Sequence, residues 1–388
     1  MKSLILCTFL LLGVSTLPPS SMPFAPIPFP FGHTTSTPYV AADGNGGFAL
    51  SWVDRTATTF NLARYDGTKW SKVDVIARGD LQDNKADYPS IAVSGRTLFA
   101  QWRERAGDDG QRIRLARSSD GGATWSAPVT PHPAMAREFG FVSMLPLADG
   151  TARIVWLDGR ANAHEGSGET QLRAATMTSS GTMTGQALID RRVCDCCQTA
   201  MAMSPRGPLV VYRDRSASEV RDIVVAVPQA GADNAPVHAD GWLIKGCPVN
   251  GPRIDSRGKH VAVAWFTAAN GTPAVNVAFS RNGGGTFGAP VRVDAGHPAG
   301  RVDLALLDDD SAIVTWVESA SPAALIMARY VRDGGPINPP QTIGSGTSAS
   351  SIGFPRIAHS KDNVLAAWNG GDGVNLVMIK ISNTVKRP

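Results

Sequence analysis

Three of the five cysteines in this chain stand within four residues, in the stretch VCDCCQTA at positions 193–200. Beyond the N-terminal region one further cysteine follows, which gives the set Cys194, Cys196, Cys197 and Cys247. Thiolates are the ligands that Cu(I) and Zn(II) favour, and a compact C-x-C-C run can supply two or three of them to one ion. The four cysteines therefore predict a copper or zinc site, which His132, His164 or His297 could complete.

Disulfides are the alternative for the same four cysteines. In that case one disulfide would join the triplet to Cys247 and another would lie within the triplet. Two adjacent cysteines, or a C-x-C pair, bond to each other only through a tight ring, so two relaxed bridges do not form easily in this layout. A redox-active or free thiol is the third interpretation. The residue types alone leave these three outcomes open.

Arginines and carboxylates form a second group with chemical potential, in the strings VDR, RER, LDGR and RDR. These strings contain six arginines, of which Arg55, Arg105, Arg160, Arg213 and Arg215 are the candidates for ligand binding. Guanidinium groups bind carboxylates and phosphates with two parallel hydrogen bonds, so these side chains predict an anionic small molecule or glycan as ligand. The alternative is that neighbouring Arg and Asp side chains neutralise each other as surface ion pairs.

The elements that position these strings repeat along the chain. Each string follows a bulky aromatic at the end of an apolar run, and the aromatics recur every 50 to 56 residues: Trp52, Trp102, Trp156, Tyr212, Trp265, Trp316 and Trp368. The apolar runs are short, β-branched and separated by Gly, Asp and Pro, which is typical of strands and not of long helices. The repeat predicts an all-β fold, a seven-bladed β-propeller of four-stranded blades, with a six-bladed ring as the alternative.

The second copy shows the expected strand order most clearly. Its four strands are predicted at 88–94, 97–104, 112–118 and 125–131. The last copy contains only three strands, so a strand from the proline-rich segment 21–36 could close the ring, since Pro is tolerated on an edge strand. Residues 37–388 are expected to form one propeller domain.

Short hairpin motifs link this repeat to a known family. Residues 118–125, SSDGGATW, match the pattern S-x-D-x-G-x-T-W, while 280–287, SRNGGGTF, and 64–70, RYDGTKW, match it in part. The chain thus resembles the sialidase (neuraminidase) superfamily, whose propellers carry this Asp-box, or BNR, repeat. The motif itself is a turn device, because a short carboxylate accepts backbone N–H bonds and the glycines supply positive φ.

The resemblance implies a set of catalytic roles. Family sialidases use a Tyr–Glu nucleophile pair, an Asp acid and an arginine clamp, which here implies Tyr212 with Glu219, Asp158 or Asp214 as acid, and the arginines named above. The activity implied is that of an exo-sialidase-like glycoside hydrolase. The family's Arg-Ile-Pro motif is absent from this sequence. The nearest strings, GPRID (251–255) and FPRIA (354–358), do not match the family's position, so the role is not transferred to them. They put Arg253 and Arg356 at the start of first strands, where these side chains could face the channel.

Composition and the N-terminus narrow the class of protein. The formal net charge is +4 over 388 residues, and no dense run of Lys and Arg suggests a nucleic-acid surface. An apolar stretch at 4–14 follows Lys2, which predicts a signal peptide over 1–20 and a secreted or periplasmic protein with no later transmembrane segment. The sequence therefore predicts an exported, sialidase-like propeller that binds an anionic or glycan ligand. A metal-binding protein centred on the cysteines and a scaffold for a protein partner are the alternatives.

Overall fold

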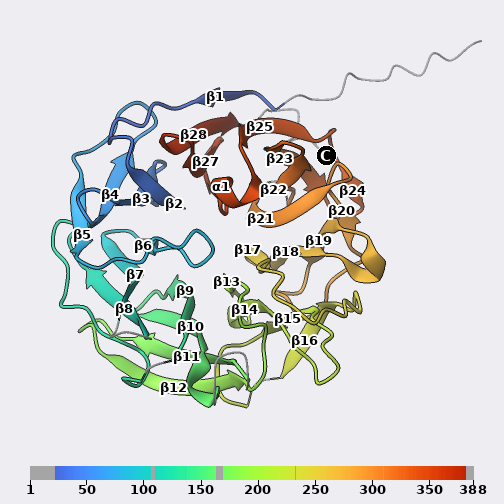
Figure 1. Cartoon of the computed structure of the whole chain (residues 1–388), viewed down its shortest axis with the longest axis horizontal. Helices are drawn as coiled ribbons and strands as arrows, with labels where there is room; N and C mark the ends of the chain where they lie inside the picture. The colour runs from blue at the N-terminus through green and yellow to red at the C-terminus, as the bar shows by residue number, and fades with distance from the viewer. Residues whose placement is uncertain are drawn as a thin grey trace, which may run out of the picture.

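The computed structural model describes residues 22–105, 110–135, 137–162, 169–231, 233–308 and 310–381. The expected signal peptide and His164 lie outside these ranges. Seven antiparallel sheets are arranged in a ring, with the first strand of each sheet next to the central axis (Figure 1). The prediction of a seven-bladed, all-β propeller is confirmed, and the six-bladed alternative is wrong.

The strands of the first four blades follow one another in chain order. The first blade contains β2 (Thr35–Ala42), β3 (Phe48–Asp54), β4 (Thr59–Tyr65) and β5 (Asp74–Arg78), and the second β6 (Ser90–Ser94), β7 (Thr97–Arg105) and β8 (Gln111–Ser118). The third contains β9 (Phe139–Pro146), β10 (Ala152–Asp158), β11 (Gln171–Met177) and β12 (Met183–Asp190). The fourth contains β13 (Ala200–Ser204), β14 (Gly207–Arg213), β15 (Ile223–Ala226) and β16 (Asn234–His238).

The last three blades complete the ring. The fifth contains β17 (Arg253–Arg257), β18 (His260–Thr267), β19 (Ala274–Ser280) and β20 (Val291–Arg292). The sixth contains β21 (Pro298–Leu306), β22 (Ala312–Ala320) and β23 (Ala323–Arg332), with both β24 (Gly335–Pro336) and β25 (Gln341–Gly346) paired to β23. The seventh contains β26 (Arg356–Ser360), β27 (Asn363–Gly370), β28 (Gly373–Lys380) and β1 (Phe24–Pro26).

Helical structure is minor in the described part of the chain. It consists of α1 (Ala349–Ile352) and two 3₁₀ turns, η1 (Gly159–Ala161) and η2 (Ala269–Gly271). No helix among these residues has the length and apolar character needed to cross a bilayer.

The seven repeated aromatics all lie on the second strand of their blades, and each is at most 4% exposed. They pack between blades: Trp102, for example, belongs to one apolar cluster with Phe60 and Leu62 of the preceding blade. Full burial of one large side chain stabilises the fold by about 1.5–3 kcal/mol. The regular spacing in the sequence therefore records the packing of one blade on the next.

The seventh blade is assembled from two distant parts of the chain. β1 pairs antiparallel with β28, and its neighbours add two bonds, from Lys380 N to Pro23 O at 2.9 Å and from Ile27 N to Leu376 O at 3.0 Å. In Figure 1, β1 lies along the outer edge of this blade. A proline fits there because an edge strand leaves one row of N–H groups unpaired.

The hairpin after β8 is organised by Asp120. Its carboxylate accepts hydrogen bonds from Thr124 N at 3.0 Å and from the Thr124 hydroxyl at 2.5 Å, and these bonds hold the pKa of Asp120 well below its usual value. Gly122, at φ +99, lies close to Leu62 of the first blade, where a Cβ would be 2.5 Å from that side chain. The hairpin thus has a structural role between two blades.

The expected fourth strand of the second blade is reduced to a single bridge. Only Val129 pairs with Leu115 of β8, through two hydrogen bonds of 2.8 and 2.9 Å. Pro128 and Pro131 flank it and have no N–H to donate, which prevents a longer ladder.

Candidate functional site

The first strands surround an axial cavity of about 420 Å³. This volume lies within the range of small-ligand pockets, about 300–1,000 Å³. Its polar lining includes Tyr39, Asp87, Tyr88, Arg253, Asp303 and Arg356, which come from the first strands of four blades and from the connection that leads into β6 of the second blade. Residues far apart in the sequence are therefore brought to one point by the ring closure.

Two arginines and one carboxylate form the centre of this lining. Asp303 forms an ion pair with Arg356, at 2.9 Å, and a longer one with Arg253, at 3.7 Å. The guanidinium groups also lie over aromatic rings, Arg356 at 5.2 Å from the centroid of Tyr39 and Arg253 at 5.9 Å from that of Tyr88. Two guanidinium charges share one carboxylate here, so the group carries a positive charge beside the cavity.

Tyr88 connects the two arginines through its hydroxyl. Its Oη accepts hydrogen bonds from Arg356 Nη1, at 3.3 Å, and from Arg253 Nη2. A phenolic oxygen has two lone pairs and one proton. Because guanidinium donors occupy the lone pairs, the proton is left for donation to another group.

A second buried ion pair, between Arg103 and Asp87 at 3.0 Å, lies beside this centre. Asp87 also accepts a 2.8 Å bond from Phe141 N, and a Cβ at position 140 would overlap its carboxylate, so Gly140 is required. Burial raises the pKa of Asp87, while Arg103 and the Phe141 amide act in the opposite direction. The charges of this pair cancel, and the cavity lining also contains a further carboxylate and guanidinium, Asp255 and Arg257. Arg253 and Arg356 with the shared Asp303 therefore form the part of the lining in which guanidinium groups outnumber carboxylates.

The arginines expected to bind the ligand lie elsewhere. Arg55 and Arg105 are exposed, and Arg105 contacts Asp80 at 3.8 Å. Arg160 makes a 2.7 Å ion pair with Asp158, and Arg215 makes one of 2.9 Å with Glu219. Arg213 is buried and donates to three backbone carbonyls, those of Asn250, Arg221 and Phe266.

The carboxylates that follow the repeated aromatics have a structural use. Asp158 is fully buried and accepts the indole N–H of Trp156 at 2.7 Å, in addition to its pair with Arg160. The same W-x-[DE] arrangement recurs at Trp102–Glu104, 2.9 Å, and at Trp316–Glu318, 2.6 Å. A buried indole N–H needs an acceptor, and the carboxylate two residues later supplies it.

Tyr212 and Glu219, the implied nucleophile pair, have separate partners. The Tyr212 hydroxyl donates to Asp190 at 2.7 Å, and burial together with that carboxylate raises the pKa of Tyr212 far above its ordinary value. Hydrogen bonds from Arg215 and Arg221 lower the pKa of Glu219 to about 2. Burial raises the pKa of Asp214 to about 6. Among the described residues that line the axial cavity, none of the nine catalytic and arginine candidates occurs.

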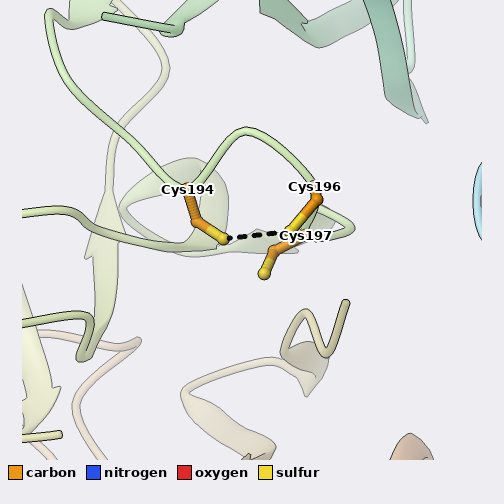
Figure 2. Close-up of side chains that lie close together, drawn as sticks. All are labelled: Cys194, Cys196 and Cys197. Atoms are coloured by element: carbon orange, nitrogen blue, oxygen red, sulfur yellow. Dashed lines mark hydrogen bonds between the residues drawn. The ribbon is translucent and has the colours of Figure 1, made fainter. Parts of the chain in front are cut away.

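The four cysteines are brought together, although they come from two different blade connections. Cys196 and Cys247 form a disulfide, and Cys194 and Cys197 are buried free thiols. Figure 2 shows Cys194 beside Cys196, with 3.7 Å between their sulfur atoms. The sulfur atoms of the triplet all lie within 4.8 Å of one another, so they could hold one metal ion.

Two arginines influence the ionisation of these thiols. Burial opposes ionisation of Cys194, but the hydrogen bond with Cys197 and the charges of Arg213 and Arg221 lower its pKa to about 7. Burial raises the pKa of Cys197 well above its ordinary value. Cys194 is thus the thiol that ionises more readily.

The cysteine stretch continues directly into the axial cavity. Gln198 and Thr199 line the cavity, and Gln198 donates to Ala86 O at 2.7 Å and accepts from Gly251 N at 2.9 Å. A Cβ at Gly251 would overlap the Gln198 carbonyl, so the two cysteine-bearing connections interlock here.

Sequence reasoning placed Arg253 and Arg356 correctly on the inner strands but did not identify Tyr39, Tyr88, Asp87 or Asp303 as their neighbours. These neighbours could have been found in the sequence from their positions on or just before the first strand of each repeat, because these strands face the axis.

No family model matches the chain, and no curated protein does. Solved structures do match in fold. A PL25 ulvan lyase, solved bound to -[GlcA(1-4)Rha3S]-, aligns over 92% of this chain and 96% of its own, at 10% identity and a TM-score of 0.58. A protein of unknown function from Dyadobacter fermentans aligns over 92% and 98%, at 16% identity and a TM-score of 0.53.

A microbial sialidase, Hz136, aligns less closely, over 86% of this chain and 76% of its own, at 12% identity and a TM-score of 0.49. All these identities are low, so the matches describe the fold and leave the activity open. Together with the seven-bladed ring, the matches to the ulvan lyase and to the Dyadobacter fermentans protein show that the chain has a β-propeller fold.

Proposed function

We propose that this protein is an exported glycan-binding propeller that holds an acidic saccharide in its axial cavity. Arg253 and Arg356 bind the saccharide's carboxylate or sulfate, and the Tyr88 hydroxyl donates a hydrogen bond to it. The observation that carries the proposal is the sharing of one carboxylate, Asp303, by two guanidinium groups that line the cavity. An anionic ligand supplies the missing negative charge.

Four further features support an acidic sugar over another anion. The cavity is of a size to hold a sugar unit or two, and the rings of Tyr39 and Tyr88 offer apolar faces beside the charges. The N-terminal apolar stretch at 4–14 favours export, where polysaccharides are encountered. The ulvan lyase that shares this fold was solved with a glucuronate-containing saccharide.

Calorimetric binding tests the proposal. Sialyllactose, a glucuronate disaccharide, a sulfated disaccharide and a neutral disaccharide are titrated into the full-length mature protein. We expect at least one acidic sugar to bind, the neutral sugar to bind more weakly, and affinity to fall with added salt. Removal of a charged partner costs about 1.5–3 kcal/mol, so Arg253→Gln and Arg356→Gln should each weaken binding about tenfold or more.

Arg55→Gln is the matched control, because Arg55 is an exposed arginine away from the cavity. Tyr88→Phe removes the hydroxyl, and with it both the donated proton and the acceptor for Arg253 and Arg356, but keeps the ring that packs near Arg253. Binding that is lost equally in Arg55→Gln, or retained in both cavity variants, would show that the saccharide binds elsewhere. With the bound sugar, product analysis for unsaturated uronates and for new reducing ends then separates lyase, hydrolase and simple binding activity.

A further inference from the structure

The cysteine cluster has the dimensions of a metal site. Four thiolates around a tetrahedral ion with Zn–S bonds of about 2.3 Å lie about 3.8 Å from one another. Cys194 and Cys196 are separated by 3.7 Å, and all three sulfur atoms of the triplet lie within 4.8 Å. Cys247 is bonded to Cys196, so the fourth sulfur already belongs to the same cluster.

The surroundings of the cluster provide positive charge for anionic ligands. Arg221 is buried, donates from Nη1 to Cys194 Sγ at 3.5 Å and shares its charge with Glu219, at 3.0 Å. Arg213 is also buried, and its carbonyl accepts a hydrogen bond from Cys194 N. Among the residues that the structure describes, its guanidinium hydrogen-bonds to carbonyls alone, which carry no net charge. A buried guanidinium charge needs compensation, and a cluster of thiolates beside it provides this.

The cluster is also accessible from one side. Cys194 and Cys197 are buried, whereas Cys196 is half-buried and the Asp195 side chain is 48% exposed. An ion can therefore reach the sulfur atoms past Cys196 and then be enclosed by the two buried thiols.

We infer that, when the Cys196–Cys247 disulfide is reduced, Cys194, Cys196, Cys197 and Cys247 bind one thiophilic metal ion, Cu(I) or Zn(II). A dithiol reductant supplies the two electrons: the Cys196–Cys247 bond breaks, both sulfur atoms become thiols, and the reductant forms its own disulfide. The incoming ion then displaces the protons of the four thiols, which are released to solvent. The disulfide form is the ion-free, oxidised state of the same site.

Metal titration of the mature protein tests the inference. The protein is reduced anaerobically with dithiothreitol, desalted, checked for four titratable thiols and titrated separately with Zn(II) and with Cu(I) against a chromophoric chelator. We expect one equivalent of one or both ions per chain, with a thiolate-to-metal absorption band. X-ray absorption on the loaded wild-type protein should report sulfur ligands only, a measurement that does not depend on any variant.

Variants locate the site. Cys194→Ser and Cys197→Ser should each weaken binding by at least about tenfold, the lower end of the loss seen when even outer-shell groups of metal sites are replaced. Asp195→Asn is the control, because Asp195 lies near Cys196 and Cys247 but is not among the proposed ligands, and it should keep wild-type affinity.

Three results would overturn the inference: reduced protein with four free thiols that binds no equivalent of either ion, equal binding by the oxidised protein, or oxygen and nitrogen ligands in the absorption spectrum. Saccharide binding is measured on separate samples, so this inference and the proposed function succeed or fail independently.

Discussion

Asp214 retains its proton to an unusually high pH, since burial raises its pKa to about 6, with further contributions from Asp190 and Asp222. An aspartate in an unfolded chain titrates near pH 4. The folded state therefore binds the Asp214 proton more tightly than the unfolded state does. Its contribution to stability is fully present below about pH 4 and is lost as the pH rises through about 6.

This linkage predicts the effect of Asp214→Asn. The substitution removes the charge but keeps an acceptor for Arg215 N, so the variant should gain about 1 kcal/mol over the wild type between pH 4 and pH 7, after allowance for partial exposure. Urea unfolding of both proteins at several pH values measures the difference. Parallel pH profiles would show that Asp214 is ionised normally in the folded protein.

At the level of the element, the two related hairpins offer a natural comparison. The Asp120 carboxylate accepts a hydrogen bond from Thr124 N at 3.0 Å. In the fifth blade, the Asn282 side-chain oxygen accepts one from Thr286 N at the same distance. We therefore expect Asp120→Asn to be nearly neutral and Asp120→Ala to lower the free energy of unfolding by about 1–2 kcal/mol, because backbone N–H bonds are lost. Thermal and urea unfolding measure both variants, and equal losses in the two would assign the stabilisation to charge instead of turn geometry.

The strands and the loops between them also show how much of the site could be predicted from the sequence. Strand order could be predicted, so the inner positions of Arg253 and Arg356 could be inferred. The described residues of the loops after the aromatics do not line the axial cavity, and their charged side chains have partners within the protein: the Asp158 carboxylate binds the Trp156 indole N–H and Arg160. Which carboxylates are occupied in this way depends on side-chain contacts that strand patterns do not specify.

At the scale of the whole molecule, the fold was the more predictable part. Seven aromatics at similar spacing indicate seven similar units, because each must pack against its neighbour in the same way. In contrast, the two partners of Asp303, Arg253 and Arg356, come from two other blades. The cysteine stretch likewise reaches the cavity through Gln198, which binds Ala86 of another blade connection. Such contacts follow from closing the ring and not from any local pattern.

Ring closure itself can be tested by shortening the N-terminal segment. A chain that begins at Met22 keeps β1, whereas one that begins at Pro28 loses its pairing with β28 and the buried Met22 side chain. Loss of several hydrogen bonds and this apolar burial should lower the free energy of unfolding by about 3 kcal/mol or more. The uncovered edge of β28 should also promote association between chains, since an open strand edge pairs readily with another. Differential scanning calorimetry and light scattering compare the two proteins; if both melt alike and remain monodisperse, the seventh blade is stable without its N-terminal strand.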